Sequence, residues 1–239
     1  MSQKFSVIIP TQNRPEFLGG SVASVLSQKN ADLEVLVVND GDALSTSFTD
    51  GRVRILDNQK RGAVPARNLG VSQARGSIIA FLDDDDTWID DLHLAKSARV
   101  LDKVAGFYFA NGVMAFPDGK IRNFFQPATA QSLEQDNTIL ISAVCYSKNL
   151  HDTLGNFDES IPYYWDWDWY LRVARSGTPL THQTAPAVSI RIHANNMSGT
   201  ANAGPRQENL DRLCAKHHLH KIVLKSHIDF ASPAQTIDK

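Results

Sequence analysis

Four apolar runs, each closed by polar or turn residues, occupy the first third of this sequence. Short uninterrupted apolar runs fit strands that are buried on both faces of a mainly parallel sheet. Helical segments separate them: one begins near Asn13, a second spans about 65–74 and a third about 90–104. This alternation predicts a doubly wound α/β sheet, mixed but mainly parallel, flanked by helices. The predicted strands are Ser6–Pro10, Leu33–Val38, Val53–Leu56 and Ser77–Leu82, and the residues expected to pack the first helix on the sheet are Phe17, Val22, Val25 and Leu26.

The pattern changes after Gly106. Two apolar segments flank Pro117–Gly119, which predicts a hairpin with a tight turn. A polar stretch, 126–137, is expected to be a loop. We expect a smaller β/α portion to follow, made of an apolar segment 138–146, an aromatic-rich helix Asp166–Arg175, a strand Ala187–His193 and a polar helix Gln207–His220.

Composition excludes several classes of protein. The chain has 24 Lys plus Arg against 26 Asp plus Glu, so it lacks the positive field that selects nucleic acid. The apolar runs are far shorter than the ~20 residues of a membrane span, and the start of the chain lacks a signal-peptide pattern. These features predict a soluble cytoplasmic protein. Cys145 and Cys214 lack CxxC spacing, so we expect buried free thiols and no zinc module.

The segment FLDDDDTW places four carboxylates directly behind the fourth apolar run. In open α/β sheets, ligands bind beyond the carboxyl ends of the strands, which is where these acids fall. The chain has neither GxGxxG after its first strand nor GxxxxGK followed by Ser or Thr, so phosphate must be neutralised in another way. Carboxylate-bound Mg²⁺ or Mn²⁺ is the expected substitute. The alternative is a solvated acidic loop in which Asp86 caps the following turn.

Four motifs, in order and at matching spacing, resemble the nucleotide-binding half of a family 2 glycosyltransferase of the GT-A fold. They are SVIIPTQNRPEFL, VLVVNDGD, RGAVPARNLG and GSIIAFLDDDDTW, and FDES, WDWDWYLRVA and RIHANNMS extend the resemblance to about residue 198. It implies an inverting, metal-dependent transfer of a sugar from a nucleoside diphosphate donor to an acceptor hydroxyl. It also implies a nucleotide-sugar-binding half at 1–115, an acceptor-binding and catalytic-base half of the same domain at 116–200, and a C-terminal helix and tail at 201–239.

The resemblance assigns donor contacts residue by residue. Asp40 is expected to accept hydrogen bonds from the base, while Asn39 stands where the family often has another acid. Arg67 is expected to hold the nucleotide or its phosphates, a task suited to a guanidinium fork; the alternative is an exposed helical arginine. The complete predicted donor set is Pro10, Thr11, Arg14, Asp40, Arg67 and Asp84, with Asp84 turned toward the ribose.

The resemblance also assigns a metal site for Mn²⁺ or Mg²⁺. Asp83 and Asp85 match the family's DxD motif, with Asp85 as the main ligand, and alternation along an extended segment points Asp84 the other way. His193 follows a predicted strand, where the resemblance implies a histidine near the metal or the diphosphate. An ordinary histidine held by neighbouring groups is the alternative.

A carboxylate must take the proton of the attacking hydroxyl during inversion. The family places this base second in a Glu-Asp pair that opens a helix, and Asp166 occupies that position here, with Trp165 in place of the glutamate. Trp165 and Trp167 are candidate acceptor contacts, although Trp167 also suits a core position. Asp166 has an N-cap as its alternative role. Asp168 is the rival base, but Arg172 four residues later predicts a surface ion pair for it.

The expected partners are a nucleoside diphosphate sugar donor and a carbohydrate or lipid-linked glycan acceptor, with no nucleic acid. Two alternatives remain: a sugar nucleotidyltransferase, which usually carries a basic glycine-rich loop that this chain lacks, and a catalytically degenerate binding protein. In the tail, basic residues beside apolar ones suggest a helix in peripheral contact with the inner face of a membrane, and partner packing is the alternative. The residues concerned are Arg212, Lys216, Lys221, Lys225, Leu213, Leu219, Ile222 and Val223, and the tail histidines His217, His218 and His220 are expected at the surface.

Overall fold

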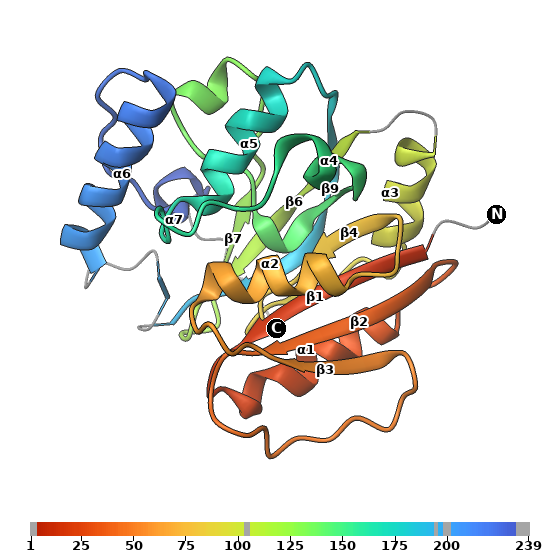
Figure 1. Ribbon diagram of the computed structural model, residues 1–239. Coiled ribbons are helices and arrows are strands. Elements are labelled where there is room, and N and C mark those ends of the chain that lie inside the picture. The colour runs from red at the N-terminus through yellow and green to blue at the C-terminus, as the bar shows by residue number, and fades with distance from the viewer. Residues whose placement is uncertain (1–3, 103–105, 194–195, 198–201, 233–239) are drawn as a thin grey trace.

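The computed structural model describes residues 4–102, 106–193, 196–197 and 202–232 (Figure 1). One nine-stranded sheet runs through the molecule in the order β3-β2-β1-β4-β8-β6-β9-β5, and β7 pairs with β6 beside this path. The order confirms the predicted mixed, mostly parallel sheet flanked by helices. The strands are β1 Lys4–Thr11, β2 Asp32–Asn39, β3 Val53–Asp57, β4 Ile78–Phe81, β5 Thr87–Trp88, β6 Phe107–Ala115, β7 Ile121–Phe124, β8 Val144–Ser147 and β9 Leu180–Arg191.

The first four strands are parallel and contain the four predicted apolar runs. Both faces of β1 and β2 are buried, which explains why their sequences are continuously apolar and do not alternate. The strand order reverses between β1 and β4, since β2 lies on one side of β1 and β4 on the other. A crevice at such a switch point is where ligands of open α/β sheets bind.

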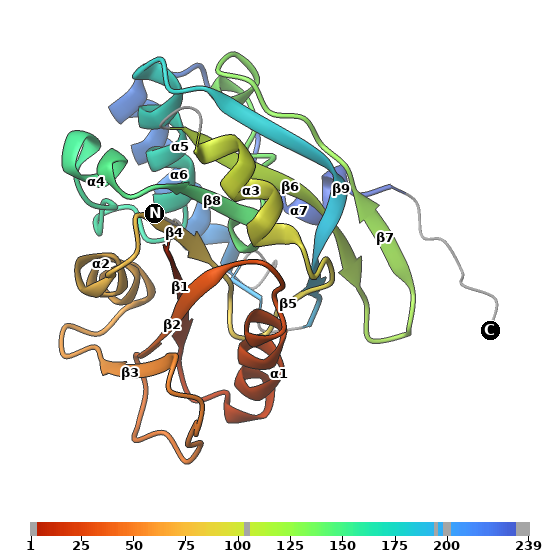
Figure 2. The ribbon, with the colours of Figure 1, turned by 90° about the vertical axis from the view of Figure 1, so that its right-hand side faces the viewer.

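Helices cover both faces of this sheet (Figure 2). One core lies between the sheet and α1 and α3, and the other lies under α2, α4, α5 and α6. The predicted helices are confirmed with small shifts in their ends; the expected end of the third, at Val104, lies outside the described residues. The helices are α1 Pro15–Leu26, α2 Ala63–Gln73, α3 His93–Leu101, α4 Asn149–Leu154, α5 Trp165–Arg175, α6 Ala203–His217 and α7 His227–Phe230, with short 3-10 turns η1 Ser132–Glu134 and η2 Ile141–Ala143.

The second half of the chain extends the same sheet. The predicted hairpin is confirmed as the antiparallel pair β6 and β7, and β6 also pairs with β8 and β9. One sheet therefore crosses the boundary expected at Ala115, and the division into two halves of one domain stays a prediction. Cys145 is a buried free thiol as expected, whereas Cys214 is only partly buried.

Asp168 is fully buried, which corrects the expected surface position. Its carboxylate accepts from Arg172 at 3.0 Å, from Lys216 at 2.6 Å and from His217 Nε2 at 2.8 Å. His217 is itself buried, so its expected surface position is also wrong. A helix whose polar face meets another helix cannot be distinguished from a solvated one by spacing alone, and here α6 covers that face. The cluster attaches α6 to α5.

The tail helix ends too early to carry all the basic residues of the suggested membrane contact. Helix α6 ends at His217, and His218 adopts a left-handed conformation with φ 54°, so Lys221 and Lys225 lie beyond the helix. Leu213 faces the core instead of an outer surface. The described residues thus hold no continuous amphipathic helix over 207–225, and none of their helices is long and apolar enough to cross a membrane.

Candidate active site

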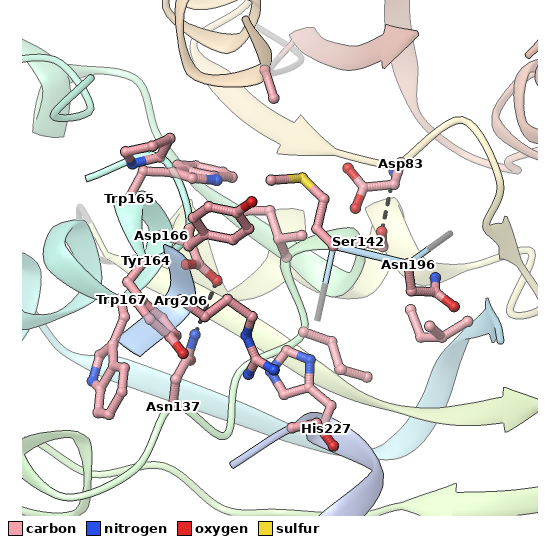
Figure 3. A pocket seen from close by; sticks show the side chains of 18 of the residues that line it. Asp83, Asn137, Ser142, Tyr164, Trp165, Asp166, Trp167, Asn196, Arg206 and His227 are labelled. Atoms are coloured by element: carbon pink, nitrogen blue, oxygen red, sulfur yellow. Dashed lines mark hydrogen bonds between the residues drawn. The ribbon is translucent and has the colours of Figure 1, made fainter. Parts of the chain in front are cut away.

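A pocket of about 460 Å³ opens at the carboxyl ends of β1, β2 and β4 (Figure 3). Residues that follow these strands line one side of it. The start of α5, the loop at 136–142 and the C-terminal segment 222–230 line the opposite side. All predicted site residues line it except Asp84 and His193. Those that do are Pro10, Thr11, Arg14, Asp40, Arg67, Asp83, Asp85, Trp165, Asp166 and Trp167.

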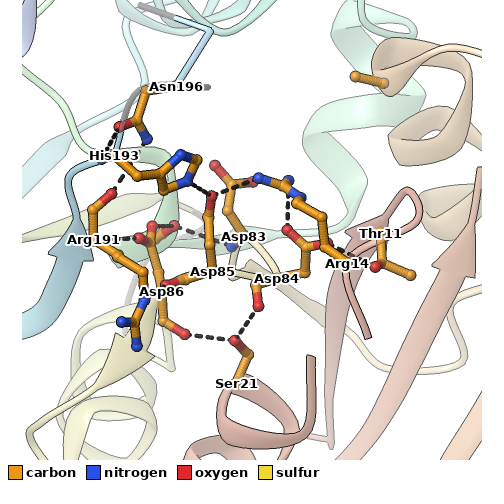
Figure 4. Close-up of polar contacts among 12 residues, drawn as sticks. Thr11, Arg14, Ser21, Asp83, Asp84, Asp85, Asp86, Arg191, His193 and Asn196 are labelled. Carbon is orange, nitrogen blue, oxygen red and sulfur yellow. Dashed lines mark hydrogen bonds and ion pairs between the residues drawn. The ribbon is translucent and has the colours of Figure 1, made fainter. Parts of the chain in front are cut away.

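Asp84 forms the buried floor beside this pocket. Its carboxylate accepts from the Thr11 hydroxyl at 2.6 Å and pairs with Arg14 Nη2 at 2.5 Å (Figure 4). Burial raises the pKa of Asp84 to about 6, against the opposing effects of Thr11 and Arg14. Asp84 is fully covered, which argues against the predicted contact between its carboxylate and a ribose. Its contacts instead hold Thr11 and Arg14 at the rim.

Asp85 contacts two of the predicted site residues, Arg14 and His193. Its Oδ2 accepts from Arg14 Nη1 at 2.6 Å and lies 2.8 Å from His193 Nε2 (Figure 4). The His193 ring stacks on Phe17, with centroids 5.9 Å apart. Phe17 was expected to pack on the sheet; it is only partly buried and supports His193, because Leu18 and Ser21 take the inner positions of α1.

Asp83 points into the pocket from the other side of the turn. Its carboxylate pairs with Arg67 Nη2 at 2.5 Å, and the Arg67 guanidinium lies 4.6 Å from the centroid of the Trp165 ring. Arg67 is only 6% exposed, so the alternative of an exposed helical arginine is wrong. A buried guanidinium between a carboxylate and an aromatic face is held in one orientation.

Asp86 does not cap the turn that follows it. Its carboxylate is buried and accepts from the Ser142 hydroxyl at 2.6 Å and from the backbone N–H of Arg191 at 3.0 Å. Burial raises its pKa well above the ordinary value. Asp86 therefore connects the turn Asp83–Asp86, called the acidic turn below, to η2 and to β9. Each of its four acids has different surroundings.

Asp40 lies at the end of β2, where the resemblance places the nucleotide base. It lines the pocket, and its carboxylate accepts from Asn58 Nδ2 at 2.6 Å and from the Gly62 N–H at 2.8 Å. Gly62 precedes α2 with φ 113°, a conformation that favours glycine. Asp40 thus fixes the entry to the helix that carries Arg67. Its contact with a base stays a prediction.

Asp166 sits one residue inside the start of α5 and faces the pocket from the side opposite the acidic turn (Figure 3). Tyr164 takes the N-cap position, so the alternative of an N-cap at Asp166 is wrong. Its carboxylate accepts from Asn137 Nδ2 at 2.9 Å. Burial raises the pKa of Asp166 to about 6, while the N–H of Trp167, Asn137 and Arg67 act in the opposite direction. Such a carboxylate suits proton abstraction near neutral pH.

Trp165 and Trp167 flank Asp166 but present little open surface, with exposed fractions of 6% and 4%. Trp165 packs its ring edge-to-face against Phe157 and supports Arg67, and Trp167 donates its indole N–H to the Leu133 carbonyl at 2.7 Å. The core position expected as one possibility for Trp167 is confirmed. Acceptor contacts by either ring stay predictions.

Several lining residues could not be predicted from the sequence. Asn137 and Ser142 come from a polar loop and a 3-10 turn, and Arg206 and His227 from α6 and the start of α7. None of them belongs to the matched motifs, and the chain brings them to the pocket only through its long-range folding. Arg191, close to the acidic turn, donates from Nε to the Asp85 carbonyl at 3.3 Å and stacks its guanidinium over Phe17.

The side chains of Asp83, Asp85 and His193 are chemically suited to bind a divalent cation. Two carboxylates and an imidazole are ligands for Mn²⁺, and Mg²⁺ is commonly held by one or two carboxylates plus substrate phosphates. Among the described residues, no three His, Cys, Asp or Glu side chains converge as a ready metal cage. Asp83 and Asp85 instead attract Arg67 and Arg14, which shows how strongly these carboxylates select positive charge.

Residues 6–152 match the model of the protein family described as glycosyl transferase family 2. The chain belongs to this family. It is 28% identical to the uncharacterized glycosyltransferase YwdF of Bacillus subtilis, over 93% of this chain and 87% of that protein. It is 30% identical to the UDP-Glc:α-D-GlcNAc-diphosphoundecaprenol β-1,3-glucosyltransferase WfgD of Escherichia coli, over 70% of this chain and 67% of that protein. The chain is therefore a glycosyltransferase that takes its sugar from a nucleotide sugar.

Solved structures share the fold. Residues 1–349 of TarS from S. aureus, in complex with UDP-GlcNAc, superpose with a TM-score of 0.69 at 18% identity, over 89% of this chain and 66% of that one. The mannosyltransferase PcManGT from Pyrobaculum calidifontis, in complex with GDP-Man and Mn²⁺, gives 0.62 at 18% identity, over 90% and 64%. The chain spans just under two thirds of each of these structures. These similarities confirm the GT-A-like fold expected from the motifs.

Proposed function

We propose that this protein is an inverting, metal-dependent glycosyltransferase in which Asp166 is the general base. The observation that supports this best is the arrangement of one pocket. The acidic turn and Arg67 line its donor side, and a single carboxylate with a raised pKa faces them from the start of α5. In the proposed reaction, this separation supports binding of the donor phosphates on one side of the reacting carbon and proton abstraction on the other.

Asp166 acts on the acceptor, and Arg67 and Arg14 act on the leaving diphosphate. Asp166 holds the acceptor hydroxyl by a hydrogen bond and takes its proton as the oxygen attacks the anomeric carbon. The bond from that carbon to the diphosphate breaks on the opposite face, so the configuration inverts. Arg67, held against Trp165, and Arg14, held by Asp84, supply the positive charge that the leaving diphosphate needs.

Asp83, Asp85 and His193 would hold the Mn²⁺ or Mg²⁺. A bound divalent cation neutralises charge on the diphosphate as it leaves. Binding of a cation at Asp83 and Asp85 would weaken the ion pairs of these acids with Arg67 and Arg14. The two guanidinium groups would then pair with the donor phosphates. These arginines therefore have two partners that compete for them: the carboxylates of the turn and the phosphates of the donor.

The proposed acceptor is a carbohydrate or a lipid-linked glycan. The part of the pocket beyond Asp166 is bordered by the apolar side chains Leu210, Ile222 and Val223, next to the cationic residues Arg206 and Lys225. A wall that combines apolar and cationic groups suits an amphiphilic acceptor with a phosphate. The relative WfgD, whose acceptor is a diphosphoundecaprenol-linked sugar, supports this class.

A donor screen tests the proposed activity. We expect one nucleoside diphosphate, such as UDP or GDP, to raise the Tm only when Mn²⁺ is present, because a ligand of the native state stabilises it by mass action. The corresponding nucleotide sugar should then be consumed with release of the nucleoside diphosphate. Release of pyrophosphate would identify a nucleotidyltransferase, and Mn²⁺-dependent binding without transfer or slow donor hydrolysis would identify a degenerate binding protein.

The pH dependence of transfer should include the titration of Asp166, and the same profile in Asp166→Asn separates it from that of the buried Asp84, whose pKa is also about 6. Because burial raises the pKa of Asp166 to about 6, the carboxyl is protonated below that pH and cannot accept the acceptor's proton. We expect kcat/KM to be level near pH 8 and to fall about tenfold for each pH unit well below 6. The measurement is a pH series with saturating Mn²⁺. An acid limb centred near pH 4, the value of an ordinary aspartate, would contradict the assignment.

A further inference from the structure

The Asp166 carboxylate is held by a residue outside the matched motifs. Asn137 donates its side-chain amide to Asp166 Oδ2 at 2.9 Å, and both residues line the pocket (Figure 3). The orientation of this amide is defined, because Asn137 Oδ1 accepts from the Ile139 N–H at 3.3 Å and so Nδ2 must face Asp166. The hydrogen bond therefore has a fixed donor and a fixed acceptor oxygen.

The C-terminal segment holds Asn137 in place. Lys225 pairs with Asp136 at 2.7 Å, and the Lys225 carbonyl accepts from Arg206 Nη2 at 2.5 Å. His227 lines the same pocket as Asn137 and packs edge-on against Phe124, with centroids 5.5 Å apart. Loop 136–137 is thus supported by segments more than 65 residues later in the chain, which explains how a polar loop can present one amide in a defined position.

We propose that Asn137 is a positioning residue for the base: its amide fixes the Asp166 carboxylate so that Oδ1, the other oxygen, receives the proton of the acceptor hydroxyl. This inference rests on the proposed function of Asp166. Oδ2, which already accepts from Asn137, has part of its capacity engaged, and the amide acts together with the Trp167 N–H to restrict rotation of the carboxylate. Because the hydrogen bond favours the charged form of Asp166, it also tunes the pH at which the base acts.

Several other groups line the same pocket as Asp166 or interact with it, and they must be considered in any pH dependence. Arg67 comes from α2, Arg206 from α6, His227 from α7, and Tyr164 and Tyr170 from the segment of Asp166 itself. Arginine stays charged at working pH. Burial lowers the pKa of His227 to about 4 and raises the pKa of both tyrosines above their ordinary value. Asp166 is therefore the group of this set that titrates between pH 5 and 8.

Two replacements of Asn137 test the inference. Asn137→Leu keeps nearly the same volume without a donor, and Asn137→Ala removes the side chain. We expect both to lower kcat more than they change KM, and to move the acid limb of kcat/KM upward by about one pH unit, since a donor to the carboxylate is lost. Asn137→Gln, which keeps an amide, should restore the limb toward its original pH. Gln135→Ala, exposed on the same loop, is the matched control and should leave the profile unchanged.

A carboxyl ¹³C NMR titration makes the test independent of activity. The Asp166 resonance is assigned by its disappearance in Asp166→Asn, and its midpoint should rise in Asn137→Leu by the same amount as the acid limb. An unchanged midpoint and an unchanged limb would overturn the inference, even if activity fell. A shifted midpoint together with full transfer activity in Asp166→Asn would keep the hydrogen bond but reject Asp166 as the base.

Discussion

Asp166→Asn should reduce sugar transfer by about 10²–10⁴-fold, the usual contribution of a general base. The substitution keeps the shape of the side chain but leaves it without a basic oxygen at neutral pH. Because Asp166 lies on the side of the pocket opposite the acidic turn, donor binding should change little. The measurements are single-turnover transfer rates and the affinity for the nucleoside diphosphate with Mn²⁺.

Asp168 provides the matched control on the same helix. Its carboxylate is buried and engaged by Arg172, Lys216 and His217, away from the pocket lining. Asp168→Asn leaves Arg172 and Lys216 without their buried counter-charge, so we expect a lower Tm with little loss of transfer per folded molecule. If Asp168→Asn abolished transfer below its Tm while Asp166→Asn retained it, the assignment of the base would be wrong.

The local motifs explain why the fold could be predicted so far. A strand buried on both faces must be continuously apolar, and the residues at its carboxyl end must turn into solvent or a ligand. Both constraints act within a few residues, so β1, β2 and β4 and the polar residues after them can be predicted from the sequence. The same logic placed Asp83 at this edge of the sheet, while the family resemblance placed Arg67 near the nucleotide or its phosphates, and the two side chains form an ion pair.

Surroundings built from distant segments could not be predicted in this way. Asp86 looked like a cap because its partners, Ser142 and the backbone of Arg191, lie more than 50 residues away. Asp168 looked like a surface residue because α6 covers it only in the folded chain. No local pattern predicts a role for Asn137, because this amide lies at the end of a polar loop. It meets α5 and the C-terminal segment only in the folded chain.

Asp85→Asn should weaken Mn²⁺ binding by at least about 100-fold, the upper range found when even an outer partner of a metal ligand is lost. The asparagine keeps the volume and one carbonyl oxygen but removes the charge that attracts a cation. The readout is Mn²⁺ affinity by calorimetry with and without UDP, so activity is not needed. Asp42→Asn, an exposed acid after β2 whose Oδ2 accepts from Asn13, is the control and should keep the affinity.

The stability of this variant separates a metal ligand from a structural acid. Without metal, Asp85 is bound by Arg14 and His193, so Asp85→Asn loses two charge-assisted contacts and should have a somewhat lower Tm. In a constant concentration of UDP, Mn²⁺ at about 100 times its dissociation constant should stabilise the wild type by about 2.7 kcal/mol, and the same Mn²⁺ concentration should add far less stability to the variant. If both proteins gained equally, Asp85 would be only an anchor for Arg14 and His193. The cation would then depend on Asp83, and Asp83→Asn would be the variant that loses it.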